Sequence, residues 1–318
     1  MSGTTMDLLA RLVRDEETFY AEQWRRAPGV LRPDHPPLDV LTVAELDRLL
    51  DAGLLTAPYA QLVHEDGTVP AARFCTPRVV LGEIADGYVD PVAVRRLIRT
   101  ERATLLLRYV DQWHAGVRAF TDGLAERFGR QVEAFCFLTP PGSRGRPVHR
   151  DDADVFAVQL HGAKRWRVYG GPADGNWQPE REDGDPGPPL LDAVLREGEV
   201  LYVPRGFAHA ATAEGEGPSV HLSLTVREAG TAQLYALTRA LLVGEGAGLP
   251  ARPNSEEELL ATAAGLLDAF ARTLDELTAE ELVELARDVM RTRREAPERG
   301  DTLGELLRGA WGTAEAAK

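Results

Sequence analysis

Residues 139–169, which begin TPPGSRGRPVHRDDADVF, constrain the fold of this chain more than any other stretch. They contain two runs rich in apolar residues, 155–160 and 164–169, separated by His161, Gly162 and Ala163. Short apolar runs on either side of a glycine-containing turn predict two β-strands joined as a hairpin. Further along, GEVLYVPRGFAHAA predicts two more adjacent strands around a Pro-Arg-Gly turn. Short strands in this order favour a β-barrel.

His149 and Asp151 form an H-x-D triplet within this stretch. On an extended strand, residues two positions apart project from the same face, so both side chains could reach one ion. His209, in GFAHAA, offers a third ligand. Two imidazoles and one carboxylate form the facial triad of non-haem Fe(II) oxygenases. The alternative is a chance pair or a surface cluster, because the motif is short and the chain has seven histidines.

Five motifs follow one another in an order that matches a known family: TPPGS, H-x-D-D, QLHGAKRWRVY, GEVLYVPRGFAHAA and SVHLSLTV. They resemble the JmjC-type cupin oxygenases, in particular the ribosomal-oxygenase branch and its bacterial relatives, over about residues 15–230. The resemblance implies an α+β fold: a double-stranded β-helix (a jelly-roll or cupin barrel) with N-terminal helices and a C-terminal all-helical domain. It also implies that His149, Asp151 and His209 are the catalytic Fe(II) ligands, with 2-oxoglutarate as cosubstrate and O2 as oxidant.

Lys164 and the C-terminal Lys318 are the two lysines of the chain. Strand alternation places Lys164 on the same face as Trp166 and Val168. If that face points inward, the ammonium group needs an anionic partner, since burying an unpaired charge is costly. The resembled family has its cosubstrate cation here, so we predict that Lys164 binds the distal carboxylate of 2-oxoglutarate. A surface lysine at a hairpin turn is the alternative.

The resemblance assigns Thr139 and His221 to the same cosubstrate site, although a hydrogen-bonded core imidazole is an alternative for His221. The strand predicted at 132–138 departs from the family. Relatives often carry an Asn and a Tyr near the cosubstrate, whereas this chain has Phe135 and Phe137 at the matching positions. We therefore expect part of the cosubstrate cradle to differ. The segment 170–189, rich in Gly, Pro and acidic residues, predicts either a functional lid or a connecting loop.

We predict that residues 1–230 form the JmjC-like domain, with a barrel core at about 103–228. Helical spacing and capping residues predict a long or broken helix at 7–26 and further helices at 42–50, 90–102 and 117–128. The texture changes at residue 231, and four helices are expected at 231–244, 255–277, 278–294 and 301–312. The resembled family dimerises through helices after its barrel, so 231–318 is expected to be a dimerisation domain. A winged-helix module at the end is expected to be reduced or absent.

The chain has 36 basic and 50 acidic residues, a net charge of -14. The negative electrostatic field of such a chain repels phosphate backbones, so nucleic acid is not an expected partner. No apolar run reaches membrane-spanning length, and the N-terminal sequence lacks the pattern of a signal peptide, so we expect no membrane association and a cytoplasmic protein. Its two cysteines, Cys75 and Cys136, are expected to be reduced.

The expected function is hydroxylation of a side chain on a protein or peptide, either a ribosomal protein or a natural-product peptide. Two alternatives belong to other classes. One is a cupin metalloenzyme that does not use 2-oxoglutarate, and the other is a non-catalytic JmjC-like binding module. The sequence does not identify the substrate, the hydroxylated residue or the stereochemistry.

Overall fold

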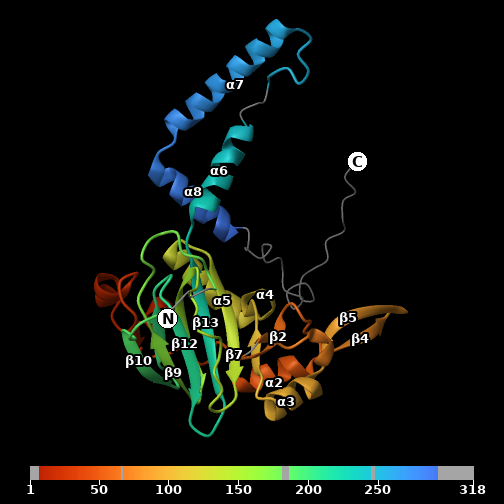
Figure 1. The fold of residues 1–318 in the computed structure, drawn as a ribbon, viewed down its shortest axis with the longest axis vertical. Helices are drawn as coiled ribbons and strands as arrows, with labels where there is room; N and C mark the ends of the chain where they lie inside the picture. Colours follow the sequence, from red (N-terminus) through yellow and green to blue (C-terminus); the bar gives the residue numbers. More distant parts are fainter. Residues whose placement is uncertain (1–6, 66, 181–185, 245–247, 293–318) are drawn as a thin grey trace, which may run out of the picture.

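Two β-sheets form the body of the protein (Figure 1). The computed structural model describes residues 7–65, 67–180, 186–244 and 248–292. In spatial order, the larger sheet contains β1 (Gly29–Leu31), β11 (Val200–Val203), β8 (Ala153–His161), β13 (Ser219–Arg227), β7 (Val132–Thr139), β6 (Thr104–Leu107), β2 (Ala60–His64) and β3 (Gly67–Thr68). The smaller sheet contains β10 (Leu191–Arg196), β9 (Ala163–Val168) and β12 (His209–Glu214). The chain repeatedly crosses between the sheets, which is the connectivity of a double-stranded β-helix and confirms the predicted fold class.

The predicted hairpin between residues 155–160 and 164–169 is wrong in its pairing. β8 is hydrogen-bonded to β11 and β13, whereas β9 is hydrogen-bonded to β10 and β12. The chain turns from one sheet to the other at Gly162, whose φ is +67° and where a Cβ atom would lie 2.4 Å from the carbonyl oxygen of Pro218. A glycine is therefore required at this corner. The two strands around the Pro-Arg-Gly turn, β11 and β12, were also predicted to be adjacent and likewise lie in different sheets.

Apolar side chains fill the space between the two sheets and also cover the outer face of the larger sheet. The inner cluster joins Val155 of β8 to Trp166 of β9 and Leu195 of β10. The outer cluster joins the larger sheet to the helices of the N-terminal half, among them α5 (Ala115–Phe128). β8 and β13 are therefore buried almost without interruption, since both faces of their sheet are covered.

The N-terminal elements follow the capping signals closely. Thr42 and Glu45 form the predicted capping box of α2 (Val43–Asp51), and Asp90 caps α3 (Pro91–Thr100). The helix predicted at 7–26 is broken into three short pieces, η1 (Leu9–Arg11), α1 (Glu16–Thr18) and η2 (Phe19–Gln23). The remaining short helices are η3 (Ala71–Arg73) and α4 (Val110–Trp113).

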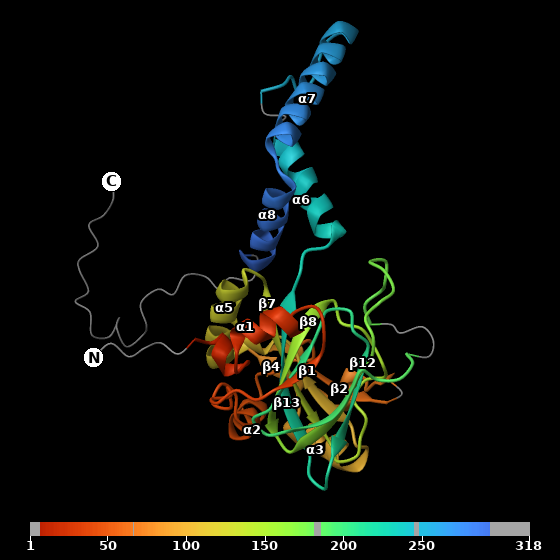
Figure 2. The same cartoon turned by 90° about the vertical axis from the view of Figure 1, so that its left-hand side faces the viewer.

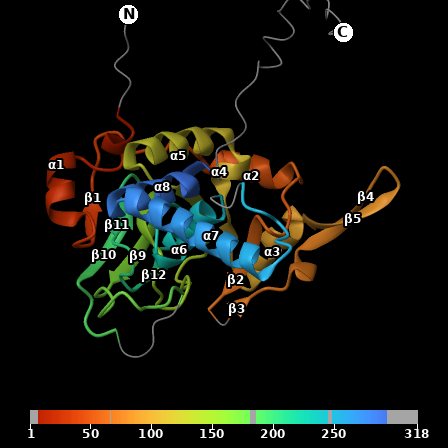
Figure 3. The same cartoon turned by 90° about the horizontal axis from the view of Figure 1, so that it is seen from above.

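A two-stranded hairpin, β4 (Cys75–Val80) and β5 (Glu83–Val89), projects from the body and was not predicted from the sequence (Figure 3). At its turn, Leu81 is fully exposed and has a positive φ of 52°. The hairpin pairs with neither of the larger sheets, so no core face produces a marked apolar and polar alternation in its sequence.

The C-terminal helices form an arm that extends away from the barrel (Figure 2). They are α6 (Thr231–Gly244), α7 (Glu256–Glu276) and α8 (Ala279–Thr292), close to three of the predicted ranges. The fourth helix predicted, at 301–312, and any winged-helix module lie outside the described residues. None of the described helices has the length and apolar character needed to cross a bilayer.

Candidate metal centre

The three predicted metal ligands come together at the rim between the two sheets. His209 is the first residue of β12, whereas His149 and Asp151 lie in the irregular segment just ahead of β8. The sequence had suggested that the triplet lies within a strand, but in the structure it lies outside one. His149 and His209 face each other as an antiparallel bridge and exchange two backbone hydrogen bonds, with N···O distances of 3.2 and 2.9 Å. This bridge brings the distant third residue beside the triplet.

The side chains of this triad converge on one point. One ligand atom from each residue lies within 4.8 Å of the other two. Nε2 of His149 is 3.7 Å from Asp151 Oδ1, and Nε2 of His209 is 3.4 Å from Asp151 Oδ2. Two ligands at right angles, each about 2.1 Å from an ion, lie about 3 Å apart. A small contraction would therefore let all three side chains bind one ion.

Backbone carbonyls orient both imidazoles. Nδ1 of His149 lies 2.8 Å from the carbonyl oxygen of Pro147, and Nδ1 of His209 lies 3.1 Å from that of Phe207. If each Nδ1 carries the proton and donates it to the carbonyl, each Nε2 presents a lone pair to the ion. This is the arrangement of a metal-binding histidine.

The charges of the triad suit a dication. Burial, reinforced by the neighbouring His209, lowers the pKa of His149 to about 3, so this imidazole is neutral near pH 7. Burial by itself would raise the pKa of Asp151, but His209, His149 and Arg146 hold it below its usual range. Neutral imidazole and a carboxylate anion are the donors that fit Fe(II).

The residues predicted to bind the cosubstrate form a second cluster, with one residue on each of β9, β7 and β13. Lys164 is 2 % exposed, and its Nζ donates a hydrogen bond of 3.0 Å to Thr139 Oγ1 and lies 3.4 Å from His221 Nδ1. Burial lowers the pKa of Lys164 to about 7. It also lowers the pKa of His221 well below its usual value, with the Lys164 charge adding to the effect. Among the described residues Lys164 has no ion pair, so this buried amine suits an anionic ligand.

One cavity of about 150 Å³ connects the triad to Lys164. Phe135 and Phe137 line it. The ring of Phe137 stacks on His221 with centroids 4.8 Å apart, and Lys164 Nζ lies 5.8 Å from its centroid. At this position an aromatic face lies beside the cation.

Seven polar or charged residues of the cavity wall were missed from the sequence: Arg108, Tyr109, Arg146, Glu180, Ser223, Thr225 and Arg227. Arg146 pairs with Glu180, and its Nη1 lies 4.0 Å from Asp151 Oδ1. Glu180 belongs to the predicted loop at 170–189, so part of this loop does reach the cavity. Tyr109 and Glu180 both have positive φ angles, 50° and 67°, which are strained for side chains of this size. Arg146, three residues before His149, could have been noticed, whereas no local signal marks Glu180.

Comparison with known proteins agrees with this geometry. A family described as the JmjC domain matches residues 113–234. "Ribosomal oxygenase 1" of Gallus gallus is 32% identical over 223 residues, 66% of this chain and 34% of the relative. "Ribosomal oxygenase 2" of Mus musculus is 29% identical over 283 residues, 83% of this chain and 58% of the relative. This chain thus spans between one third and three fifths of the length of these two relatives.

A solved structure supports the fold. The X-ray structure of E. coli YcfD superposes with a TM-score of 0.57 and 21% sequence identity, covering 85% of this chain and 70% of that chain. At this level of identity the likeness shows a shared fold and does not transfer a substrate.

Proposed function

This chain belongs to the JmjC-domain proteins, and from that premise we propose that it is an oxygenase that uses Fe(II), 2-oxoglutarate and O2 to hydroxylate a side chain of a protein or peptide. The observation that carries the proposal is the set of residues that line one cavity. A cluster of two histidines and one aspartate lies at one end, and beyond it lies a buried lysine that has no acidic partner among the residues described. A ligand that is both a metal chelator and a dicarboxylate matches this pair of sites.

Each residue then has a defined task. His149, Asp151 and His209 would hold the ion and leave its other positions open, and the Asp151 carboxylate would offset part of its charge. Lys164 and Thr139 would bind the distal carboxylate of 2-oxoglutarate. Bound Fe(II) would let O2 act as the oxidant, with one oxygen atom going into a C–H bond of the substrate and the other into 2-oxoglutarate, which would leave as succinate and CO2. The apolar walls, including Phe135 and Phe137, would keep bulk water away from that chemistry.

The substrate class is inferred from the relatives. Besides the ribosomal oxygenases, a protein named "Bifunctional lysine-specific demethylase and histidyl-hydroxylase NO66" from Drosophila mojavensis is 39% identical over 119 residues. These names point to protein side chains, so we propose a ribosomal protein or a natural-product peptide as the substrate. The mouth of the cavity, which includes Arg146 and Glu180, would contact that substrate.

We also propose that residues 231–318 serve as a dimerisation domain. The arm exposes a set of large apolar side chains along α6 and α7: Tyr235, Val243, Leu259, Leu260, Leu267 and Leu274. Exposed apolar rows of this kind are normally covered, and a second copy of the chain is the commonest cover in soluble proteins. Light scattering at micromolar concentration should give twice the mass of one chain, and a monomer mass would contradict the dimer.

A cytoplasmic setting is part of the proposal, and the two cysteines, Cys75 and Cys136, are both free thiols. Reduced cysteines are typical of that compartment.

Anaerobic titration with Fe(II), followed by 2-oxoglutarate, tests the function directly. We expect one ion per chain and then the visible charge-transfer absorption of the metal-bound 2-oxo acid. Iron binding without that absorption would favour a cupin enzyme that does not use 2-oxoglutarate. Failure to bind iron would favour a non-catalytic binding module.

A further inference from the structure

The indole N–H of Trp166 is a buried donor that has no acceptor in the described part of the chain. Trp166 is 5 % exposed, and its Nε1 has no hydrogen-bond partner among the described residues. A buried indole N–H normally finds an acceptor, because leaving it unpaired costs free energy. Its neighbours in the inner cluster, which include Val155, Leu195 and Leu201, are apolar and offer no side-chain acceptor. Trp166 also lines the cavity, so an acceptor could come from a molecule bound there.

Strand register places Trp166 between the two ends of the cavity. On β9 the side chains of Lys164, Trp166 and Val168 share one face. Across the ladder to β12, Lys164 pairs with Ala213, Trp166 with Ala211 and Val168 with His209. Trp166 thus lies two residues along β9 from Lys164 and two residues from Val168, the partner of His209. The residue opposite, Ala211, is small and also lines the cavity.

Distances agree with this central position. The Trp166 ring centroid is 6.0 Å from that of His209 and 5.3 Å from that of His221. Nζ of Lys164 lies 5.8 Å from the centre of the same ring. A molecule that extends from the triad to Lys164 must therefore pass alongside the indole.

We propose that Trp166 is a specificity-determining residue whose indole N–H donates a hydrogen bond to an oxygen of 2-oxoglutarate. The inference rests on the function proposed above and adds a donor to it. 2-Oxoglutarate carries oxygen acceptors at both ends, and the carboxylates are strong ones. In this chain the indole would supply a polar contact in a cradle where Phe135 and Phe137 supply none.

The experiment uses the full chain loaded with Zn(II), which binds similar ligands and does not turn over. Proton–nitrogen correlation spectra with 15N-labelled tryptophan resolve the indole N–H signals, and Trp166→Phe identifies the Trp166 signal by its absence. On addition of 2-oxoglutarate we expect that signal to move downfield, as a newly formed hydrogen bond requires. Calorimetry should show 2-oxoglutarate binding to Trp166→Phe roughly 10-fold more weakly than to the parent.

Trp113→Phe is the matched control. The indole N–H of Trp113 already donates to the carbonyl oxygen of Arg108 at 3.0 Å, and this residue does not line the cavity. Its loss should leave 2-oxoglutarate affinity within about twofold of the parent. If Trp166→Phe does not fold, Mn(II) loading assigns the Trp166 signal through paramagnetic broadening. Among the described tryptophans, Trp166 is the one that lines the cavity.

The outcomes separate the two proposals. An unmoved Trp166 signal, or parent-like affinity in Trp166→Phe, overturns the inference while the parent still binds 2-oxoglutarate. A parent chain that binds Zn(II) but not 2-oxoglutarate overturns the inference together with the proposed function.

Discussion

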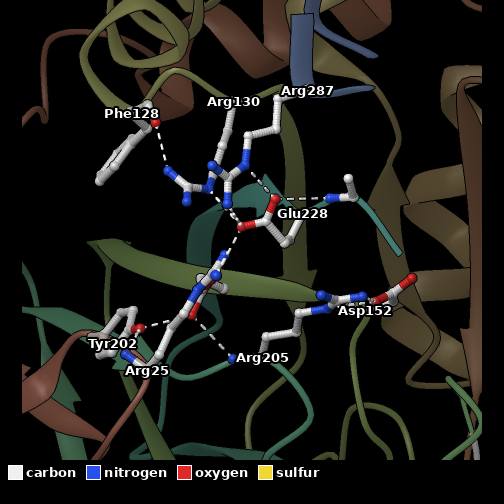
Figure 4. Close-up of polar contacts among 10 residues, drawn as sticks. Arg25, Phe128, Arg130, Asp152, Tyr202, Arg205, Glu228 and Arg287 are labelled. Carbon is white, nitrogen blue, oxygen red and sulfur yellow. Dashed lines mark hydrogen bonds and ion pairs between the residues drawn. The ribbon is translucent and has the colours of Figure 1, made fainter. Parts of the chain in front are cut away.

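Two clusters of buried ionisable residues lie near opposite ends of β13, and they differ in how their charges are balanced. The cavity cluster contains Lys164, on β9, and His221, near the start of β13. The Glu228 cluster begins directly after its end (Figure 4). There the Glu228 carboxylate, on a residue 8 % exposed, pairs with Arg25 at 2.8 Å, Arg130 at 2.9 Å and Arg287 at 2.8 Å.

The neighbouring Asp154 is also fully matched. It accepts hydrogen bonds from Arg25 Nε at 3.1 Å, from the Tyr202 hydroxyl at 2.7 Å and from the backbone N–H of Arg205 at 3.1 Å. Its side chain is completely buried. The carboxylates of Glu228 and Asp154 therefore both have positively charged groups and hydrogen-bond donors around them, as buried ions require.

The pKa values express the same contrast. Burial by itself would raise the pKa of Glu228, but the bound Arg287 and Arg130 hold it below its usual range. Burial lowers the pKa of Lys164 to about 7, and no carboxylate in the described part of the chain forms an ion pair with it. A buried charge that the protein itself neutralises stabilises the fold, whereas one left unmatched in a cavity marks a ligand site.

The Glu228 cluster also connects parts of the chain that are distant in sequence. Arg25 follows the N-terminal helical turns, Arg130 follows α5, and Arg287 belongs to α8. One carboxylate thus fixes the foot of the helical arm to the barrel and to the N-terminal segment.

The largest effect is expected from Asp151→Ala, because two neutral imidazoles would then face a dication alone. We expect Fe(II) affinity to fall roughly a thousandfold and activity to be lost. Metal analysis after dialysis measures the first effect. Asp152→Ala is the control, since Asp152 pairs with Arg205 and is not part of the triad. Parent-like iron binding by Asp151→Ala would show that the triad assignment is wrong.

Glu228→Gln should damage the fold and spare the cavity. We expect a loss of about 3 kcal/mol in the free energy of unfolding, since three guanidinium groups lose their anion. Urea unfolding checks the loss, and calorimetry with Zn(II) should show unchanged metal affinity.

The pH dependence of that loss follows from the lowered pKa of Glu228. A carboxylate whose pKa falls on folding stabilises the protein fully above its ordinary pKa, here 4.5, and loses that contribution as the pH falls through the lowered value. The difference between parent and Glu228→Gln should therefore be constant near neutral pH and shrink below pH 4.5. A difference independent of pH would contradict the structural role of this ion cluster.

Lys164→Ala tests the unmatched charge. We expect the apparent KM for 2-oxoglutarate to rise roughly 30-fold, about 2 kcal/mol, the range for a hydrogen bond to a charged group. Iron content should stay at the parent level. Lys164→Arg should restore only part of the affinity, because a forked guanidinium does not fit a site built for a compact ammonium group. An unchanged KM would reopen the case for a cupin that does not use this cosubstrate.

A smaller effect is the uptake of protons by Lys164 when 2-oxoglutarate binds. With a pKa of about 7, about half of the Lys164 amines are neutral at pH 7, and binding a carboxylate should charge them. Of the facing groups, the Cys136 thiol stays protonated because burial raises its pKa to about 12. His221 stays neutral because its pKa is lowered, and the Thr139 hydroxyl does not titrate.

Binding of 2-oxoglutarate should therefore take up about half a proton at pH 7, and its affinity should fall about tenfold from pH 6 to pH 8. Calorimetry in two buffers of different ionisation enthalpy measures the uptake. Lys164→Arg should abolish it, since a guanidinium group stays charged throughout this range. Equal heats in both buffers would mean that Lys164 is already fully charged before the ligand binds.

Features that depend on short-range geometry follow from the amino-acid sequence alone. The Thr42 and Asp90 caps, the strands around His161 and the helices after residue 231 follow from local periodicity and local hydrogen bonds. The H-x-D triplet is also local, and so is the strand face that Lys164 shares with Trp166 and Val168. The sequence left open whether that face points inward, and the structure shows that Lys164 is buried.

Which distant residues meet depends on the fold of the whole chain. It separated β8 from β9 and β11 from β12, and it placed His149 opposite His209. It also gathered Arg25, Arg130 and Arg287 around Glu228, and it placed Trp166 in the cavity wall with no acceptor among the described residues. These relations depend on how the barrel closes, and closure is fixed by the packing of many side chains together, so no short stretch of sequence records it.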